Sequence, residues 1–362
     1  KDMNTITTLS KKFLFAAALG VAAISVQAQE MSETTMEAQA EEAPAFSLSG
    51  TVDTYFKANP GYGTTTPATS FTSGTGFSMG MVNLVGSYEG EKTGVVADLV
   101  FGPRGIEAAF GAPIGGSIVN QMYAYWNVSD KVTLTMGQWN TFLGYEVISP
   151  AANINYSTSY MFSWGPFSQS GLKADFALND DLSLMIALMN PTDVLETNVV
   201  GPDGADDFNY TLGFQLGYKG TYLNARYGDA SGELFQVDLT GGYDLTETFY
   251  LGVNATILDD GANGGFIGAA IYPKIAISET FAIAARAEYF AVSDNYGGIL
   301  ATDVNGDGNV INLTLSANYM VGPLTLIPEV RIDMTSEDNY ADTDGKASSS
   351  LPTLILAAVY SF

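Results

Sequence analysis

Residues 351–362 read LPTLILAAVYSF and show a strict alternation of side chains. One face of this stretch comprises Leu354, Leu356, Ala358, Tyr360 and Phe362. Successive side chains of a β-strand point to opposite faces, so the pattern predicts a long strand with one apolar face.

The same period of two recurs along the chain from Phe46 onward. In 324–334, for example, Leu326 and Ile332 oppose Glu329 and Arg331. Many of these segments run about 9–13 residues, whereas strands of soluble sheets peak near 5–6 residues. A strand that crosses a bilayer at a tilt of about 45° needs about 9–11 residues, so the lengths favour membrane strands.

We expect sixteen strands, with fourteen or eighteen as the alternatives. They are placed at 46–57, 77–88, 93–101, 118–128, 131–139, 168–178, 182–189, 207–219, 221–228, 232–243, 247–257, 264–277, 280–291, 310–321, 323–334 and 351–362.

The gaps between these segments fall into two classes. Tight turns occupy 89–93, 129–130, 179–181, 244–247, 278–279 and 321–323. Longer loops lie between them at 58–76, 102–117, 140–167, 190–206, 292–309 and 335–350. Short turns on one side and long loops on the other are typical of bacterial outer-membrane barrels. The sequence therefore predicts an all-β fold, a transmembrane antiparallel β-barrel, with both termini on the short-turn, periplasmic side.

The composition excludes several classes of function. The 362 residues include no Cys and no His, so disulfides, thiolate metal sites and imidazole-based catalysis are absent. Only 15% of residues are charged, against about 25% in soluble domains. The net charge of −25 argues against a nucleic-acid partner. We expect no enzymatic activity.

The N-terminal region is expected to direct export. Lys11 and Lys12 precede an apolar run at 13–24, and Val26-Gln27-Ala28 fits a signal-peptidase site. We therefore assign 1–28 to a signal peptide and 29–45 to a flexible acidic periplasmic lead-in, and 46–362 form the barrel. The apolar run is well short of the ~20 residues that a spanning helix needs.

Four stretches resemble one known family. They are GTVDTYF (50–56), SYEGEKTGVVADLVFGP (87–103), NQMYAYWNVSDKVTLTMGQWNTFLGYEV (120–147) and NYSTSYMFSWGPFSQSGLKA (155–174). The chain is similar here to the OmpL-like β-barrel porin family of Bacteroidota, most strongly over 46–190. This resemblance implies a porin or channel of the bacterial outer membrane, and it supplies no catalytic residues.

The expected partners follow from this location. Tyr360 and the terminal Phe362 resemble the C-terminal signal that the barrel-assembly machinery recognises. The outer face would contact outer-membrane lipid and lipopolysaccharide, and the lumen would admit small polar solutes. A homotrimer is an assembly that porins of this strand number often adopt, although the sequence shows no interface.

A barrel of sixteen strands leaves an aqueous channel, and its polar faces would line that channel. The candidate pore-lining residues are Asp53, Lys57, Asp98, Lys173, Asp175, Lys219, Arg226, Asp238, Arg286, Glu288, Glu329, Arg331 and Asp333. The simpler interpretation is that these charges form salt bridges within a solvated wall. The alternative is a transverse field at a constriction that orients dipolar solutes.

Acidic residues gather in the expected loops: Asp203, Asp206, Asp207, Asp259, Asp260, Glu337, Asp338, Asp342 and Asp344. Acid at a pore mouth concentrates cations within about one Debye length, ~8 Å at physiological salt. We therefore expect a mild cation preference. These acids would otherwise bridge divalent cations with lipopolysaccharide or stay solvated.

The longest loop, 140–167, is rich in aromatic residues. Its candidate constriction residues are Phe142, Tyr145, Glu146, Tyr160 and Trp164, with Tyr156 and Phe162 nearby. As the third long loop it is a candidate to fold inward and narrow the pore. The more ordinary interpretation places its aromatic rings in the interfacial girdle or in packing within the loop itself.

One short motif suggests a calcium loop. Asp303, Asn305, Asp307 and Asn309 place oxygen atoms at alternate positions around a Gly turn. The twelfth position of an EF-hand frame is Thr314, where a Glu is expected, so a plain Asp/Asn/Gly turn is the preferred interpretation. No other cofactor is expected.

Two functions from different classes stay open. The first is a porin for passive diffusion of small hydrophilic solutes or ions. The second is a structural or adhesive barrel, or a subunit of a larger outer-membrane complex, with an occluded lumen. Conduction through the purified protein separates the two.

Overall fold

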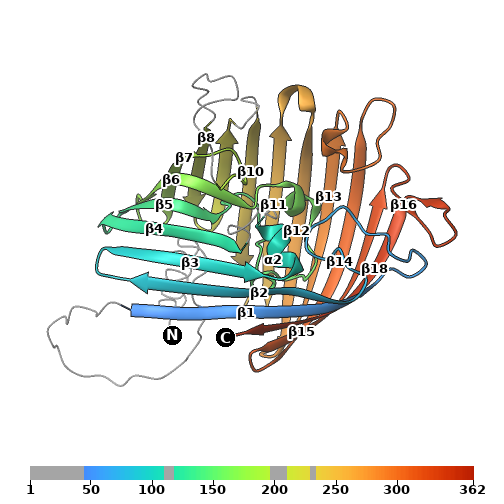
Figure 1. Ribbon diagram of the computed structural model, residues 1–362, viewed down its shortest axis with the longest axis horizontal. Helices are drawn as coiled ribbons and strands as arrows, with labels where there is room; N and C mark the ends of the chain where they lie inside the picture. The colour runs from blue at the N-terminus through green and yellow to red at the C-terminus, as the bar shows by residue number, and fades with distance from the viewer. Residues whose placement is uncertain (1–44, 110–117, 196–209, 229–233) are drawn as a thin grey trace.

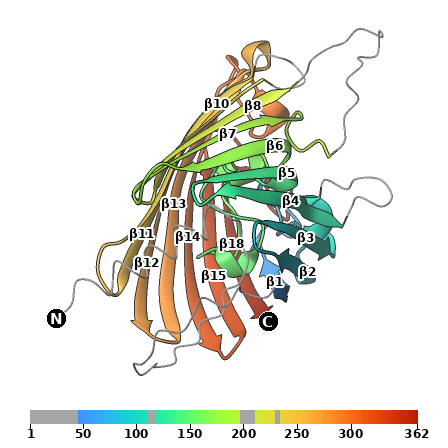
Figure 2. The same ribbon diagram turned by 90° about the vertical axis from the view of Figure 1, so that its left-hand side faces the viewer.

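The computed structural model describes residues 45–109, 118–195, 210–228 and 234–362. Within these residues, sixteen antiparallel strands close into one barrel, with neighbours in chain order and β1 paired to β18. The predicted fold class is thus confirmed (Figures 1 and 2). The predicted signal peptide and most of the lead-in lie outside the described residues, as do Asp203, Asp206 and Asp207.

The barrel strands are β1 Ala45–Ala58, β2 Gly76–Glu89, β3 Thr93–Phe101, β4 Val119–Ser129, β5 Val132–Asn140, β6 Ser168–Ala177, β7 Leu182–Met189, β8 Thr211–Tyr218, β9 Thr221–Tyr227, β10 Phe235–Asp244, β11 Phe249–Asp259, β12 Gly265–Ser278, β13 Phe281–Ser293, β14 Gly308–Val321, β15 Leu324–Thr335 and β18 Ser350–Ser361. The connections contain the helices α2 Pro103–Ala108 and α3 Tyr160–Trp164, the small sheet of β16 Tyr340–Ala341 and β17 Ala347–Ser348, and the 3-10 turns η1 Pro150–Ala152, η2 Gly261–Asn263 and η3 Tyr296–Gly298.

Two expectations need correction. Ala45 is the first residue of β1, although the sequence assigned it to the lead-in. Lys219 does not line the lumen: it lies in the turn between β8 and β9 with φ 50°, and its side chain is 57% exposed, 3.6 Å from Asp181 of the neighbouring turn. The alternating pattern runs on into this turn, and alternation alone does not show where a strand ends.

The two faces of the wall have inverted polarity. On β14, Ile311, Leu313 and Leu315 are 43–50% exposed on the outer surface. Asn312 and Thr314, between them, are at most 3% exposed and face inward. Apolar side chains outside and polar ones inside are what a lipid-embedded barrel requires.

The ends of the chain close the barrel. β1 pairs with β18 from Thr51–Ser361 to Ala58–Leu354, and Gly50 and Phe362 exchange backbone hydrogen bonds of 2.9 and 3.0 Å. Closure leaves no free strand edge in the bilayer. The role of Tyr360 and Phe362 as an assembly signal stays a prediction.

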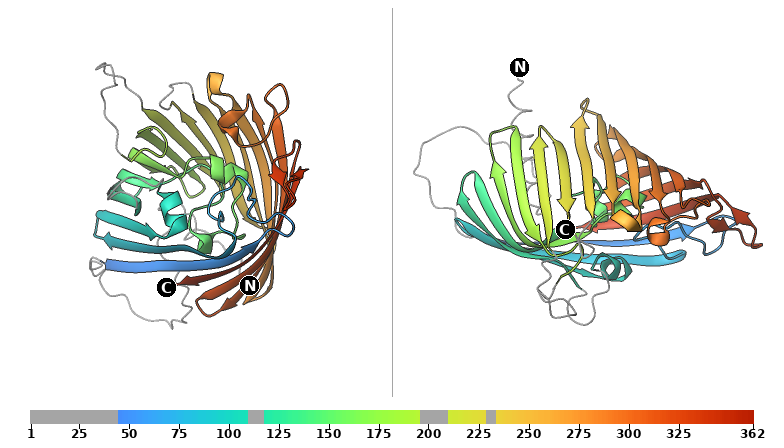
Figure 3. Two further views of the ribbon diagram at one scale, coloured as in Figure 1. Left: turned by 45° about the vertical axis from the view of Figure 1, so that its right-hand side comes forward. Right: turned by 90° about the horizontal axis from the view of Figure 1, so that it is seen from above.

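The connections differ in length at the two ends of the barrel. We call the end with turns 130–131 and 219–220 the short-turn end, and the end with loops 59–75 and 141–167 the long-loop end. Both Ala45 and the C-terminus lie at the short-turn end (Figure 3). Among the described residues, no helix is long and apolar enough to cross a membrane.

Ile271 on β12 tests the assignment of the outer face, because it points outward near the middle of its strand and is 49% exposed. We expect Ile271→Arg to lower the free energy of unfolding by about 2–4 kcal/mol, the usual cost of an Arg on the lipid side near the bilayer midplane. Urea titration of the protein folded in phospholipid vesicles measures this. Ile271→Leu is the matched control, and an Arg variant as stable as this control would show that the face does not contact lipid.

Candidate functional site

The loop between β5 and β6, residues 141–167, folds into the barrel (Figures 1 and 2). Tyr156 and Tyr160 have no exposed surface, and Met161 and Phe162 are at most 5% exposed. We call 141–167 the inserted loop. The structure therefore agrees with the hypothesis that the loop folds inward, and not with a placement of its aromatic rings in the interfacial girdle. The effect of the loop on conduction is a separate question.

Carboxylates of the barrel wall bind the backbone N–H groups of the inserted loop. Glu329 on β15 accepts hydrogen bonds of 2.8 and 3.0 Å from the N–H groups of 156 and 157. Glu288 on β13 accepts bonds of 3.0 and 2.8 Å from those of 160 and 161. Each carboxylate is fully buried and accepts hydrogen bonds from two N–H groups that have no neighbouring strand to bond. The wall therefore supplies the acceptors that a neighbouring strand would supply in a sheet.

Arginines of the wall bind the carbonyl groups of the same loop. Arg286 on β13 donates to the carbonyl of Ser157, 2.5 Å away, and forms an ion pair of 2.7 Å with Glu146. Arg331 on β15 donates to the carbonyl of Thr158 over 2.8 Å. These guanidinium groups are at most 1% exposed. Buried charges are tolerated only when paired and hydrogen-bonded, and both conditions are met here.

Further polar contacts fasten the loop to β1 and to neighbouring strands. The hydroxyl of Tyr156 donates to Asp53 on β1 over 2.6 Å. Asp333 on β15 binds Arg331 in a bidentate contact at 2.8 Å. Asn155 donates to Ser316 on β14 over 2.7 Å. All of these anchors lie on β1 and β13–β15, so the loop rests against one side of the lumen.

Glycines of the wall make room for the side chains of the inserted loop. A Cβ added at Gly252 on β11 would lie 2.4 Å from the ring of Tyr145, and one at Gly268 on β12 would lie 2.3 Å from Cγ of Met161. The ring of Tyr145 also stacks on Tyr272, with centroids 4.3 Å apart. Such contacts leave no space for a larger residue at either glycine.

Three of the predicted basic residues point inward but make none of the bonds to the inserted loop described above. Lys57 donates to a carbonyl of loop 59–75 and is 1% exposed. Arg226 on β9 hydrogen-bonds Gln236 at 2.8 Å. Lys173 on β6 forms an ion pair of 2.9 Å with Asp175. The Lys173–Asp175 contact is a salt bridge of the kind that the simpler interpretation of the wall charges expected, whereas Lys57 bonds a carbonyl and Arg226 bonds an amide.

Two predicted acids are bound by neutral donors instead. Asp238 on β10 accepts hydrogen bonds from the N–H of Gly144 at 2.9 Å and from the amides of Asn224 and Asn254 at 2.9 and 2.5 Å. Asp98 on β3 is likewise held by three side-chain amides. Neither acid has an ion pair among those found for the described residues.

Sequence reasoning missed Arg104, which lies in α2. Its Nε donates to the carbonyl of Ile148 over 3.1 Å, and its guanidinium lies 4.5 Å from the ring centroid of Phe71 and 5.4 Å from that of Tyr156. The residue is 1% exposed and holds the start of the inserted loop against loop 59–75. No alternating strand pattern surrounds it, so periodicity gave no signal.

The end of the inserted loop is held by Asp193, which follows β7. Its carboxylate accepts hydrogen bonds of 2.9 and 2.7 Å from the N–H groups of Phe167 and Ser168. Burial raises the pKa of Asp193 to about 6, although these N–H groups oppose the shift. Near the rim, Trp164 donates from Nε1 to the carbonyl of Ala68 over 2.8 Å.

A cavity of about 410 Å³ remains between the inserted loop and the opposite wall. We call it the vestibule, and β4–β10 together with the start of the loop line it. Beyond it, a gap of about 10 Å³ runs beside β10 and β11 toward the long-loop end. A cavity needs about 10–15 Å³ to hold one water. Gly144 lines both spaces, and its hydrogen bond to Asp238 lies between them.

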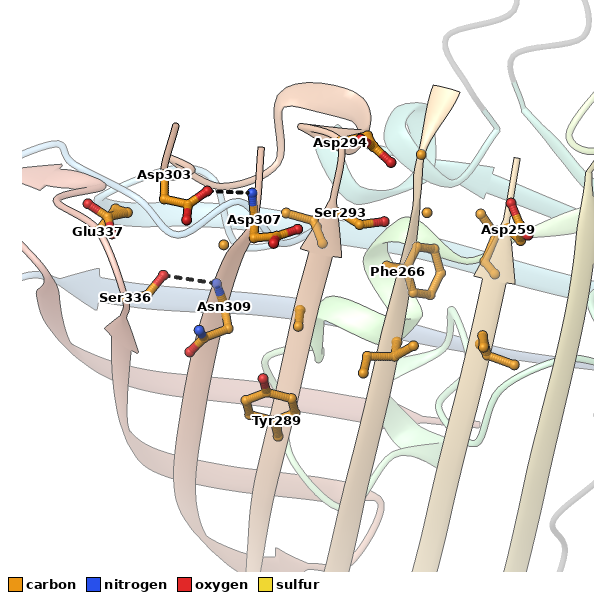
Figure 4. A pocket seen from close by; sticks show the side chains of 18 of the residues that line it. Asp259, Phe266, Tyr289, Ser293, Asp294, Asp303, Asp307, Asn309, Ser336 and Glu337 are labelled. Atoms are coloured by element: carbon orange, nitrogen blue, oxygen red, sulfur yellow. Dashed lines mark hydrogen bonds between the residues drawn. The ribbon is translucent and has the colours of Figure 1, made fainter. Parts of the chain in front are cut away.

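The calcium candidates lie elsewhere, at the rim of a 710 Å³ groove formed by the ends of β11–β14 (Figure 4). Asp303 accepts hydrogen bonds from the N–H groups of Asn305 and Asp307 at 2.8 and 3.1 Å. These bonds lower the pKa of Asp303. Asn309 donates from its N–H to Ser336. The described part of the chain holds no group of three His, Cys, Asp or Glu side chains placed to hold a metal ion, and the calcium assignment stays untested.

Glu288 tests the role of the wall acids as loop anchors. We expect Glu288→Ala to lower the free energy of unfolding by about 1.5–3 kcal/mol, the usual contribution of hydrogen bonds to a charged group. We also expect faster proteolysis within 148–162, because two N–H groups lose their acceptor. Glu279→Ala, in the exposed turn between β12 and β13, is the control. Equal cleavage rates in the two variants would argue against anchoring.

Comparisons with known proteins agree with this architecture. DcaP, an outer-membrane channel of Acinetobacter baumannii, aligns with a TM-score of 0.55 at 13% identity, over 89% of this chain and 99% of that one. An anion-selective porin from Comamonas acidovorans gives 0.55 at 12% identity, over 88% and 100%. These identities show the fold alone. No curated protein sequence matches the chain.

The family comparison covers almost the whole barrel. The model of the family "Putative beta-barrel porin-2, OmpL-like" matches residues 45–362. The predicted resemblance is thus confirmed, and so is a location in the bacterial outer membrane. The inserted loop, the inverted polarity and this match lead to one conclusion: the chain belongs to the OmpL-like β-barrel porin-2 family.

Proposed function

We propose that this porin allows passive diffusion of small hydrophilic solutes and ions, and that the inserted loop sets the size limit. The observation that carries the proposal is the vestibule of about 410 Å³, which lies beneath a loop held to the wall by both polar contacts and apolar packing. The path we propose follows β10 and β11 past the contact between Gly144 and Asp238.

A second candidate is an occluded barrel with a structural or adhesive role, alone or within a larger complex. The observation in its favour is the burial of residues 155–162, which fill the lumen toward the long-loop end. The porin is preferred because a lumen that stays closed would need neither the vestibule nor the amide-bound carboxylate of Asp238 beside it.

Planar-bilayer recording of the refolded protein separates the two candidates. We expect discrete conductance steps in the wild type and a severalfold larger step after deletion of 148–162, because the deletion removes the narrow part of the lumen. Deletion of 304–306 in the rim loop is the control and should leave the step size unchanged. Silence of both the wild type and the 148–162 deletion would favour the occluded barrel.

We also propose the mild cation preference that the sequence suggested. Asp238 lies between the vestibule and the small gap beyond it, and its described partners are neutral donors that leave its negative charge uncompensated. The Comamonas porin is described as anion-selective, but at 12% identity its preference does not transfer.

Reversal potentials in a salt gradient test this preference. We expect Asp238→Asn to lower the cation-to-anion permeability ratio, because the amide keeps an acceptor for Gly144 and loses the charge. Glu279→Gln removes one charge from an exposed turn and should have little effect. Anion preference in the wild type, or equal ratios in both variants, would contradict the proposal.

We propose further that rim acids such as Asp259 and Glu337 contact lipopolysaccharide through divalent cations.

We also propose that the barrel-assembly machinery recognises the strand that ends in Tyr360 and Phe362. The side chains of Tyr360 and Phe362 lie 45% and 55% exposed on the outer surface, where a partner can reach them. A homotrimer is the assembly we propose for the intact membrane.

A further inference from the structure

The vestibule has a lining that differs from the rest of the lumen. Aromatic rings face it from three elements: Tyr123 from β4, Trp139 from β5 and Tyr222 from β9. The inserted loop adds Phe142 and Tyr145. The cavity of about 410 Å³ falls within the range of about 300–1,000 Å³ that small-molecule sites occupy.

The polar groups between these rings are mostly neutral. Thr135 and Thr240 contribute hydroxyls to the lining and Asn140 contributes an amide, whereas the amides of Gln121 and Gln215 already bond other protein groups. Neutral donors and acceptors next to aromatic faces suit a ligand that is itself neutral and carries many hydroxyl groups.

The charges of the vestibule compensate each other. Lys173 and Asp175 form an ion pair of 2.9 Å, and Nζ of Lys173 lies 5.8 Å from the ring centroid of Trp139. A compensated pair offers hydrogen bonds without a net charge, so it does not favour an anion or a cation. It therefore agrees with a neutral solute.

Two polar atoms of the lining residues have no hydrogen-bond partner within the described part of the chain. They are Nε1 of Trp139, a donor, and Oδ1 of Asn140, an acceptor. Trp139 is 5% exposed, and buried polar groups are normally paired. Both atoms have less than 1 Å² of accessible surface, so they lie behind the lining, and a solute reaches them only when the side chains move.

We infer that the vestibule is a binding site for a neutral cyclic saccharide of one or two rings. The apolar C–H face of a pyranose ring packs against Trp139 and Tyr222, and its hydroxyls bond the threonine hydroxyls of the lining and the Lys173–Asp175 pair. A flat aromatic hydrocarbon would leave the hydroxyls of Thr135 and Thr240 without a ligand partner, and an acyclic polyol has no rigid face to stack. The inference rests on the proposed porin function, for which it names a solute class.

Binding is tested with D-glucose and maltose on the full chain refolded in detergent, by calorimetry and intrinsic fluorescence. Of the three tryptophans, Trp139 lines the vestibule and Trp126 lies 50% exposed on the outer face. We expect a saturable fluorescence change that Trp139→Phe abolishes. Trp139→Ala should weaken calorimetric affinity at least about tenfold, equivalent to about 1.4 kcal/mol, and Trp126→Ala should leave it unchanged.

Further probes keep the test decisive. Tyr222→Leu should weaken binding in the same direction and serves if Trp139→Ala fails to fold. Mannitol, an acyclic polyol, should bind at least about tenfold more weakly than glucose, a difference of about 1.4 kcal/mol. Absence of saturable sugar binding would overturn the inference. So would tighter binding of glycine that Lys173→Met removes, since that result would assign the site to a zwitterion.

Failure of this inference and failure of the porin proposal are distinguishable. Binding in detergent does not require a continuous path through the lumen. Sugar binding without conductance would keep the site and reject the channel, whereas conductance without sugar binding would keep the channel and reject the site.

Discussion

The rest of the lumen depends on one interaction: charged side chains of the wall pair the backbone of an inserted loop. A backbone segment inside a closed barrel has no strand beside it, and unpaired N–H and C=O groups are costly where water is excluded. Glu288 and Glu329 accept the N–H groups, while Arg286 and Arg331 bind the carbonyls. Because both signs are needed for this task, the wall carries both, and the residues that resemble a transverse pore field act first as anchors.

The anchors lie on one side, and this asymmetry shapes the free space. The bonds to β1 and β13–β15, together with the glycine contacts on β11 and β12, draw the loop against that part of the wall. The vestibule therefore remains along β4–β10. At the junction of the two regions, Asp238 binds Gly144 of the loop without a cationic partner among those found for the described residues. Selectivity is expected to depend on this junction more than on the anchors, which are committed to the backbone of the loop.

The barrel could be predicted from the sequence because the bilayer imposes one rule on every strand. Outward positions such as Leu313 are apolar and inward ones such as Asn312 are polar, so alternation and turn length together fix the architecture. The same rule placed Lys219 wrongly, because a turn residue with positive φ continues the alternation without facing the lumen. The inward position of Glu288 was predictable, but its partner was not, because Tyr160 lies 128 residues away in sequence.

Glycines show why the inserted loop left so weak a signal. Within a strand, a glycine weakens the alternating pattern that identifies the strand. The reason for the glycine becomes clear only when the residue packed against it is known. Gly252 and Gly268 admit Tyr145 and Met161 of the loop, residues that lie more than 100 positions earlier in the chain. Small inward residues on adjacent strands therefore indicate a body packed against the wall rather than an open pore. Where the wall instead presents large aromatic residues, as at Trp139 and Tyr222, the start of the loop packs beside them only in part, and a cavity of about 410 Å³ is left for a solute.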